Sequence, residues 1–258
     1  MNNRLSLIFL LLILPFSSLY AGPQKGQFTL STGTTFTSGD YDSPHTTEML
    51  YIPVTLKYKK DKWKIKLTVP YLKVKGPQNV LRNIGQVTEN VLDPDSINEG
   101  LGDIDLSVGY RLLYHQKSKT LLDLTGKVKF GTADEKKNLG TGENDYALAL
   151  GMYKLLGDFT PYATFGRKHY GNSSRFQLND VFFGSLGLSY KASRQTSTGV
   201  NLYLKDKTAS TRSNTRQLSA YVSHKLDSNW KLLGYVLTGL SENTPDLGGG
   251  FSLAYQFK

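Results

Sequence analysis

The sequence predicts an all-β fold, an antiparallel transmembrane β-barrel of about 12 strands with short periplasmic turns and longer extracellular loops. Three observations predict it. Apolar and polar residues alternate with period two in many short segments, the connections between those segments alternate in length, and no segment after the first residues is apolar enough for a membrane helix. The rival fold is a secreted β-sandwich, whose connections need not alternate in length.

The chain begins with the pattern of an export signal. Arg4 precedes an apolar run from Leu5 to Leu14, Pro15 ends the run, and Ala21 before Gly22 is a plausible cleavage point. The run is about half of the roughly 20 residues that a membrane helix needs, so an anchor helix is the weaker alternative. We therefore expect a signal peptide at 1–21, a barrel domain at 22–258, and export through the periplasm to the outer membrane.

The predicted strands follow from the alternation. In the segment 62–73, Trp63, Ile65 and Leu67 share one face, while Lys64 and Lys66 share the other. The same pattern recurs near residues 27–37, 50–58, 104–112, 122–130, 182–190, 200–204, 218–222 and 251–257. In a barrel the apolar face of each strand contacts lipid and the polar face lines the lumen.

The connections strictly alternate in length. Tight connections are predicted near 60–61, 115–118, 157–158, 192–195 and 227–229, and longer polar ones near 38–46, 75–99, 131–142, 169–179, 206–215 and 242–247. Outer-membrane barrels have short periplasmic turns, long outer loops and even strand numbers. The pattern therefore places both ends of the barrel on the periplasmic side.

Aromatic residues lie near the predicted strand ends. Tyr58 and Trp63 flank one tight turn, which is typical of the girdle that contacts lipid headgroups. The last strand ends in Tyr255-Gln256-Phe257 and resembles the aromatic-ended final strand that barrel-assembly machinery recognises, although Lys258 follows it here. The expected partners are thus outer-membrane lipid and that machinery.

Composition excludes several classes of function. The chain has no Cys, which removes disulfides and thiolate metal sites, and its four His residues show no metal-ligand spacing. The net charge is +10, but the basic residues are spread along the chain, so we expect no nucleic-acid partner. Ser223 and His224 are neighbours and point to opposite faces of a strand. We therefore expect no catalytic residues, no metal and no cofactor.

Strand parity predicts which charged residues line the lumen. A charge on the lipid face costs about 2–4 kcal/mol at mid-membrane, so charged residues within the strands should point inward. The candidates are Lys66, Asp105, Arg111, Asp123, Lys127 and Lys129. Two roles are open for them: they steer a polar or anionic solute, or they form an ion-pair network that fills and stiffens the wall.

The longest predicted connection carries its own hypothesis. Within 78–93 the apolar residues Val80, Ile84, Val87 and Val91 are spaced as on one face of a helix, with Asn79 available as a cap. We expect either a short amphipathic helix that narrows the barrel mouth or a surface loop.

Two groups of motifs resemble a known family. Gly100-Leu101-Gly102-Asp103-Ile104-Asp105-Leu106 is similar to the start motif of the phenol-degradation MetA-pathway-like outer-membrane family. The stretch 128–134, then Leu139-Gly140-Thr141-Gly142 and Asp145-Tyr146, resembles it too. The family commonly has Pro where this chain has Gly131. The resemblance covers about residues 47–192 and implies a transporter-like outer-membrane barrel.

These observations lead to three functional hypotheses. The first is a channel or transporter-like barrel for passive passage of small solutes, polar or aromatic. The second is a structural or surface-interaction barrel whose lumen is filled by side chains. The third, less favoured because no catalytic group was identified, is a lipid-active outer-membrane enzyme.

Overall fold

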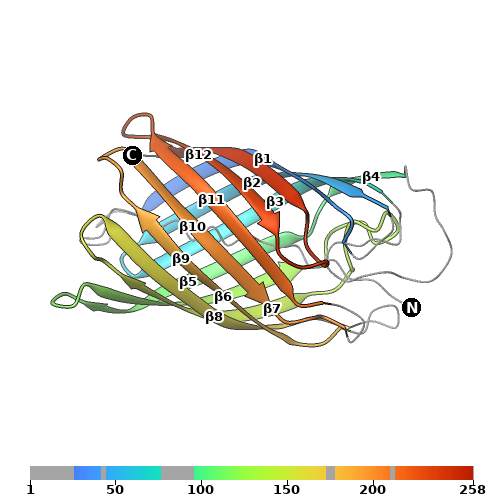
Figure 1. The fold of residues 1–258 in the computed structure, drawn as a ribbon, viewed down its shortest axis with the longest axis horizontal. Helices are drawn as coiled ribbons and strands as arrows, with labels where there is room; N and C mark the ends of the chain where they lie inside the picture. Colours follow the sequence, from blue (N-terminus) through green and yellow to red (C-terminus); the bar gives the residue numbers. More distant parts are fainter. Residues whose placement is uncertain (1–25, 42–44, 77–95, 173–177, 210–212, 258) are drawn as a thin grey trace.

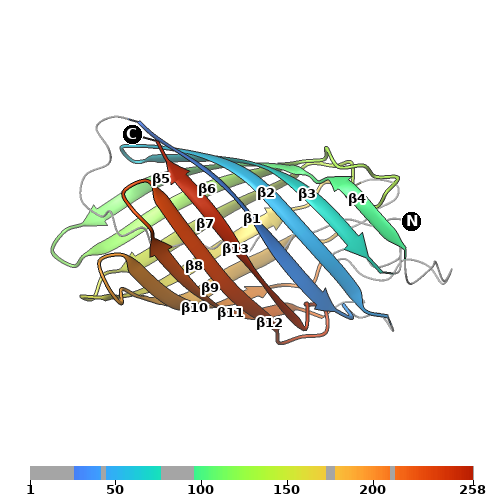
Figure 2. The same ribbon diagram turned by 90° about the horizontal axis from the view of Figure 1, so that it is seen from above.

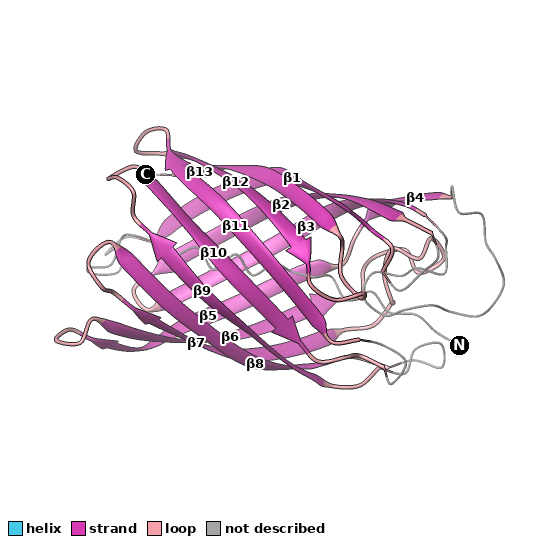
Figure 3. Cartoon of the chain, viewed as in Figure 1, coloured by secondary structure: helices cyan, strands magenta, loops and turns pink. Residues whose placement is uncertain are grey.

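The computed structural model describes residues 26–41, 45–76, 96–172, 178–209 and 213–257 (Figure 1). All of its regular structure is β (Figure 3). The strands are β1 (Gln27–Gly39), β2 (Thr47–Lys60), β3 (Trp63–Lys75), β4 (Ile97–Leu101), β5 (Ile104–His115), β6 (Thr120–Phe130), β7 (Asp145–Lys154), β8 (Phe159–His169), β9 (Val181–Tyr190), β10 (Thr196–Lys205), β11 (Thr215–Lys225), β12 (Trp230–Gly239) and β13 (Leu247–Gln256). In the described ranges, no helix is long and apolar enough to cross a membrane.

The strands close into an antiparallel barrel. β1 pairs with β2 on one side and with β13 on the other, which joins the first strand to the last. β4 and β5 lie end to end along β3 and together form one wall strand, so the wall has 12 strands. Figures 1 and 2 show the strands slanting around the barrel axis, as closure requires. The predicted barrel and its strand number are confirmed.

The connections divide the barrel into two ends. The short connections 61–62, 116–119, 155–158, 191–195 and 226–229 lie at one end of the barrel. The strand ends that are joined by the longer connections 40–46, 76–96, 131–144, 170–180, 206–214 and 240–246 lie at the other end. Gln27 pairs with Lys59, so the described chain also enters at the short-turn end. By the rule for outer-membrane barrels, the short-turn end is periplasmic.

The outer face of the wall is an apolar belt. Leu56, Leu67 and Leu148 are 42%, 40% and 56% exposed, and their strand neighbours on the other face are Thr or Lys at the first two positions and Ala at the third. So large an exposed apolar surface is unfavourable in water and favourable against lipid. Because the apolar side chains face outward towards lipid, most of the barrel has no conventional apolar core inside it.

Aromatic pairs join neighbouring strands at the short-turn end. The ring centroids are 4.7–4.8 Å apart in the pairs Phe28–Tyr58, Trp63–Tyr110, Phe159–Tyr190 and Trp230–Tyr255. Such pairs contribute about 0.5–1.5 kcal/mol each beyond their burial. Their common level fits the predicted girdle at the membrane interface.

Candidate functional site

The six predicted lumen residues lie on the inner face of three adjacent strands, β3, β5 and β6. Lys66 and Asp123 line a cavity of about 440 Å³ inside the barrel. Arg111 donates to both carboxylate oxygens of Asp123, at 2.8 and 3.2 Å, and the two residues are direct cross-strand partners. The Lys127 ammonium lies 2.7 Å from Asp105. Most of these charges are therefore engaged in ion pairs along the wall.

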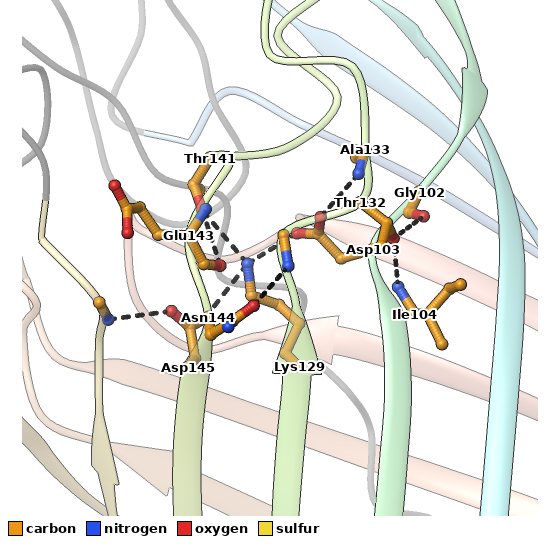
Figure 4. A network of polar contacts seen from close by, with 12 residues as sticks. Gly102, Asp103, Ile104, Lys129, Thr132, Ala133, Thr141, Glu143, Asn144 and Asp145 are labelled. Atoms are coloured by element: carbon orange, nitrogen blue, oxygen red, sulfur yellow. Dashed lines mark hydrogen bonds and ion pairs between the residues drawn. The ribbon is translucent and has the colours of Figure 1, made fainter.

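Lys129 is the centre of a buried polar network at the long-loop end (Figure 4). Its Nζ donates to Asp103 Oδ2 at 2.7 Å and to Thr141 Oγ1 at 3.3 Å, and lies 3.5 Å from Asp145 Oδ2. Lys168 approaches the same Asp145 oxygen at 3.0 Å. Lys129, Asp103 and Asp145 are each no more than 3% exposed, so they stabilise one another in place of water.

This network anchors the loop between β6 and β7. Asp103 Oδ1 accepts a hydrogen bond from the backbone N–H of Ala133, and Thr141 of the same loop accepts one from Lys129. Leu139 and Ala133 then pack against Met49 and Leu72, which are buried at the long-loop end of the barrel. Residues 131–144 therefore fold onto the lumen and narrow its outer mouth.

Gly131 allows that loop to turn back on itself. A Cβ at this position would lie 2.3 Å from the backbone N of Glu143 and from the carbonyl carbon of Gly142. Neither backbone atom can move without opening the loop. The glycine at the position where the resembled family commonly has Pro thus permits a close backbone approach.

Two adjoining cavities lie between the described residues that line the lumen. The larger, of about 440 Å³, lies towards the short-turn end. The smaller, of about 240 Å³, lies towards the long loops beneath Tyr41 and Pro245. Both are lined by Ser31, Thr55, Lys66, Leu233 and Ser252. Among the described residues, the lumen therefore holds space both at the short-turn end and beneath Tyr41 and Pro245.

The predicted constriction by Val80, Ile84, Val87 and Val91 lies outside the described residues, as does the predicted signal peptide. Both stay predictions. Excision of 80–92 is still expected to raise single-channel conductance if that segment lies in the mouth.

Several residues of the network were missed by sequence reasoning. Asp103, Asp145 and Lys168 were not among the predicted lumen residues, although all three take part in the buried ion pairs. Asp103 and Asp145 stand inside the motifs that carried the family resemblance. Their position inside these motifs could have indicated that they lie in the network, because motif residues that are distant in sequence often meet in one structural element.

The side-chain contacts of His115, His169 and His224 do not form a catalytic arrangement. His169 Nδ1 lies 2.7 Å from Asp180, His224 Nδ1 lies 2.9 Å from Thr196, and His115 Nδ1 lies 2.7 Å from Ser118. None of these three rings joins a hydroxyl to a carboxylate, as a hydrolase triad does. Within the described ranges, no group of three His, Cys, Asp or Glu residues could hold a metal.

The fold is similar to those of solved outer-membrane proteins. The crystal structure of the COG4313 outer membrane channel from Pseudomonas putida F1 aligns with a TM-score of 0.71 and 15% identity, covering 94% of this chain and 99% of that one. The KdgM porin aligns with a TM-score of 0.51 and 12% identity, over 89% and 99% of the two chains. A TodX monoaromatic hydrocarbon channel deltaS2 mutant also gives 0.51 and 12%, over 92% and 91%.

No curated protein matches the sequence. The model of one protein family, described as "Putative MetA-pathway of phenol degradation", matches residues 20–257. This match spans nearly the whole chain, including both groups of motifs and the network that they form. The chain therefore belongs to this family, as an outer-membrane β-barrel.

Proposed function

We propose that the protein is a passive outer-membrane channel for small solutes and that the lumen is their path. The observation that carries the proposal is the pair of adjoining cavities, about 440 and 240 Å³, inside a wall that is polar within and apolar outside. A barrel that only anchored a surface would not need open space along its axis.

The family membership and the fold support the same proposal. Proteins described as an outer membrane channel, a porin and a monoaromatic hydrocarbon channel share the architecture. A small polar or aromatic solute fits the cavity, since it matches the volume of ordinary small-molecule sites. In this proposal the protein is not an enzyme, needs no cofactor, and reaches the membrane through the periplasm and the barrel-assembly machinery.

Liposome swelling tests the proposal. Liposomes that carry the folded protein are placed in isotonic solutions of uncharged sugars of increasing size, and swelling reports entry of each sugar. We expect swelling with a pentose and little with a trisaccharide, because the loop 131–144 folds onto the mouth and packs Leu139 there. Swelling no faster than in protein-free liposomes, for every sugar, would contradict a passive channel for polar solutes.

A filled structural barrel is the second candidate, and one observation favours it. At the long-loop end the side chains of Leu139, Tyr170 and Asn243 are each 1% exposed, so packed side chains occupy much of the mouth. Shortening the loop between β6 and β7 distinguishes the two candidates. A channel gains permeability from the change, whereas a barrel filled along its length does not.

A further inference from the structure

The short-turn half of the lumen concentrates positive charge. Among the residues that the structure describes, five Lys side chains and two Asp side chains line the 440 Å³ cavity. The Lys residues are Lys57, Lys64, Lys66, Lys225 and Lys231, and the acids are Asp123 and Asp227. One of those acids, Asp123, is already bound by Arg111 through two hydrogen bonds. The cavity thus carries a clear excess of positive charge.

The pairing of the strands places these Lys residues opposite one another. Lys57 is the direct cross-strand partner of Lys66, and Lys59 that of Lys64. A third pair, Lys225 and Lys231, joins β11 to β12. Like charges directly opposite each other destabilise a sheet. Three such pairs on one inner surface lower the stability of the folded barrel, and the sequence nevertheless keeps them.

The three pairs belong to one electrostatic group. The charges of Lys64, Lys231, Lys59 and Lys66 all act on Lys57, so the group extends from β2 and β3 to β12. The neighbouring part of the wall is built differently. On β5 and β6 the chain sets Arg111 against Asp123 and Lys129 against Asp105 as direct partners. On β5 and β6 opposite charges therefore face each other, whereas in the three pairs of β2–β3 and β11–β12 Lys faces Lys.

An apolar surface lies in the same cavity. Tyr153, Phe183, Tyr203 and Leu233 line it together with the Lys residues. Tyr153 also stacks with Tyr162, with ring centroids 6.0 Å apart, which holds its ring in place. A solute in this cavity meets ammonium groups from β2, β3 and β12 and aromatic rings from β7, β9 and β10.

We propose that this cavity is a binding site for small aromatic carboxylates. The carboxylate lies among Lys57, Lys66 and their neighbours, where it relieves the repulsion between them, and the ring packs against the aromatic side chains. The inference rests on the proposed channel, for which the cavity provides the inner part of the path. It adds the class of solute that the path favours.

Equilibrium binding to the folded protein in detergent tests the site. The probe is benzoate, with neutral benzamide as its uncharged counterpart and acetate as its counterpart without a ring. We expect benzoate to bind at least tenfold more tightly than either, and to weaken as salt is added because the attraction is between charges. Equal binding of benzoate and benzamide would overturn the charge recognition, and equal binding of benzoate and acetate would overturn the role of the rings.

Paired substitutions locate the site. Lys57→Gln with Lys66→Gln should weaken benzoate binding at least tenfold, while Lys136→Gln with Lys191→Gln, both exposed outside the cavity, should change it less than twofold. Removal of a like-charge pair should leave the barrel folded, which the heat-dependent shift in gel mobility verifies. Lys225→Gln with Lys231→Gln is the second test pair if the first does not fold. Undiminished binding in a folded variant overturns the proposal.

The experiments distinguish failure of the proposed binding site from failure of the proposed channel. Benzoate binding without solute flux into liposomes would leave the site in place and remove the proposed channel. Flux of sugars without benzoate binding, and without preference for anions over cations, would leave the channel in place and remove the site.

Discussion

Replacement of Lys129 by Met tests whether the buried network holds the outer loop in place. The side chain is 3% exposed and is bound to Asp103 at 2.7 Å. Met has a similar length and no charge, so the substitution removes the ion pair with little change in volume. Asp145 keeps Lys168 at 3.0 Å, and Asp103 keeps the N–H of Ala133 at 3.0 Å. The variant therefore contains one buried carboxylate, that of Asp103, which has lost its cation.

The size of the effect follows from that carboxylate. Breaking a buried ion pair from one side typically costs about 3–5 kcal/mol. The loss has a ceiling, because Asp103 can take up a proton instead of remaining charged. At pH 7 that protonation costs about 4 kcal/mol, since an ordinary Asp titrates about 3 pH units lower and each unit corresponds to about 1.4 kcal/mol. We expect the free energy of unfolding to fall by about 3–4 kcal/mol at pH 7.

The same reasoning fixes the sign of the pH dependence. In the variant the folded chain holds a proton that the unfolded chain releases at neutral pH, so the penalty grows with pH and shrinks as pH falls. At pH 5 the ceiling is about 1.5 kcal/mol. Urea unfolding of the protein in lipid vesicles, followed by Trp fluorescence at both pH values, measures the difference.

Two further variants complete that experiment. Asp103→Asn with Lys129→Met should recover much of the lost stability, because an amide oxygen still accepts from Ala133 and no charge remains. Lys136→Met, at an exposed position of the same loop, should change stability by no more than about 0.5 kcal/mol. A loss in Lys129→Met that is below about 1 kcal/mol at pH 7, or that does not depend on pH, would refute the reasoning.

Three other predictions concern the wall and the mouth. Gly33→Ala should destabilise the barrel by about 1–3 kcal/mol, because the added Cβ would lie 2.1 Å from a backbone oxygen on β13. Gly126→Ala, whose Cβ would have no atom within 4 Å, should be nearly neutral in the same urea titration. Replacement of residues 134–141 by Gly-Gly should raise the single-channel conductance at least twofold, because that loop carries Leu139 into the mouth; unchanged conductance would contradict the constriction. Trp63 and Trp230, both at the short-turn end, should be quenched more strongly by lipids brominated near the headgroup than near the chain end, and the reverse order would displace the girdle from the interface.

The architecture could be predicted from the sequence because the patterns that define the strands and turns are local. Period-two alternation defined the strands, and turn residues defined the alternating connections, without knowledge of any distant contact. The tight turn at Asp61 and Lys62 even determines its register, which places Lys59 opposite Lys64 and Lys57 opposite Lys66. These like-charge pairs could therefore have been predicted from the hairpin alone.

The arrangement of residues at the outer mouth could not be predicted from local patterns. Parity places Lys129 on the inner face but does not show which acid meets it, since Asp103 lies 26 residues earlier and the loop conformation brings Ala133 and Thr141 to the same point. The break between β4 and β5 at Gly102 and Asp103 likewise depends on long-range pairing with β3. Contacts of this kind are set by closure of the whole barrel.

Single-channel current through the purified, refolded protein in a planar bilayer tests the central claim most directly, that the lumen is a path for solutes. The account predicts discrete current steps, larger when residues 134–141 are replaced by Gly-Gly, and a reversal potential in a salt gradient that shows preference for anions. The absence of current steps in both proteins, at every voltage and with the folded barrel verified in the same preparation, would contradict it.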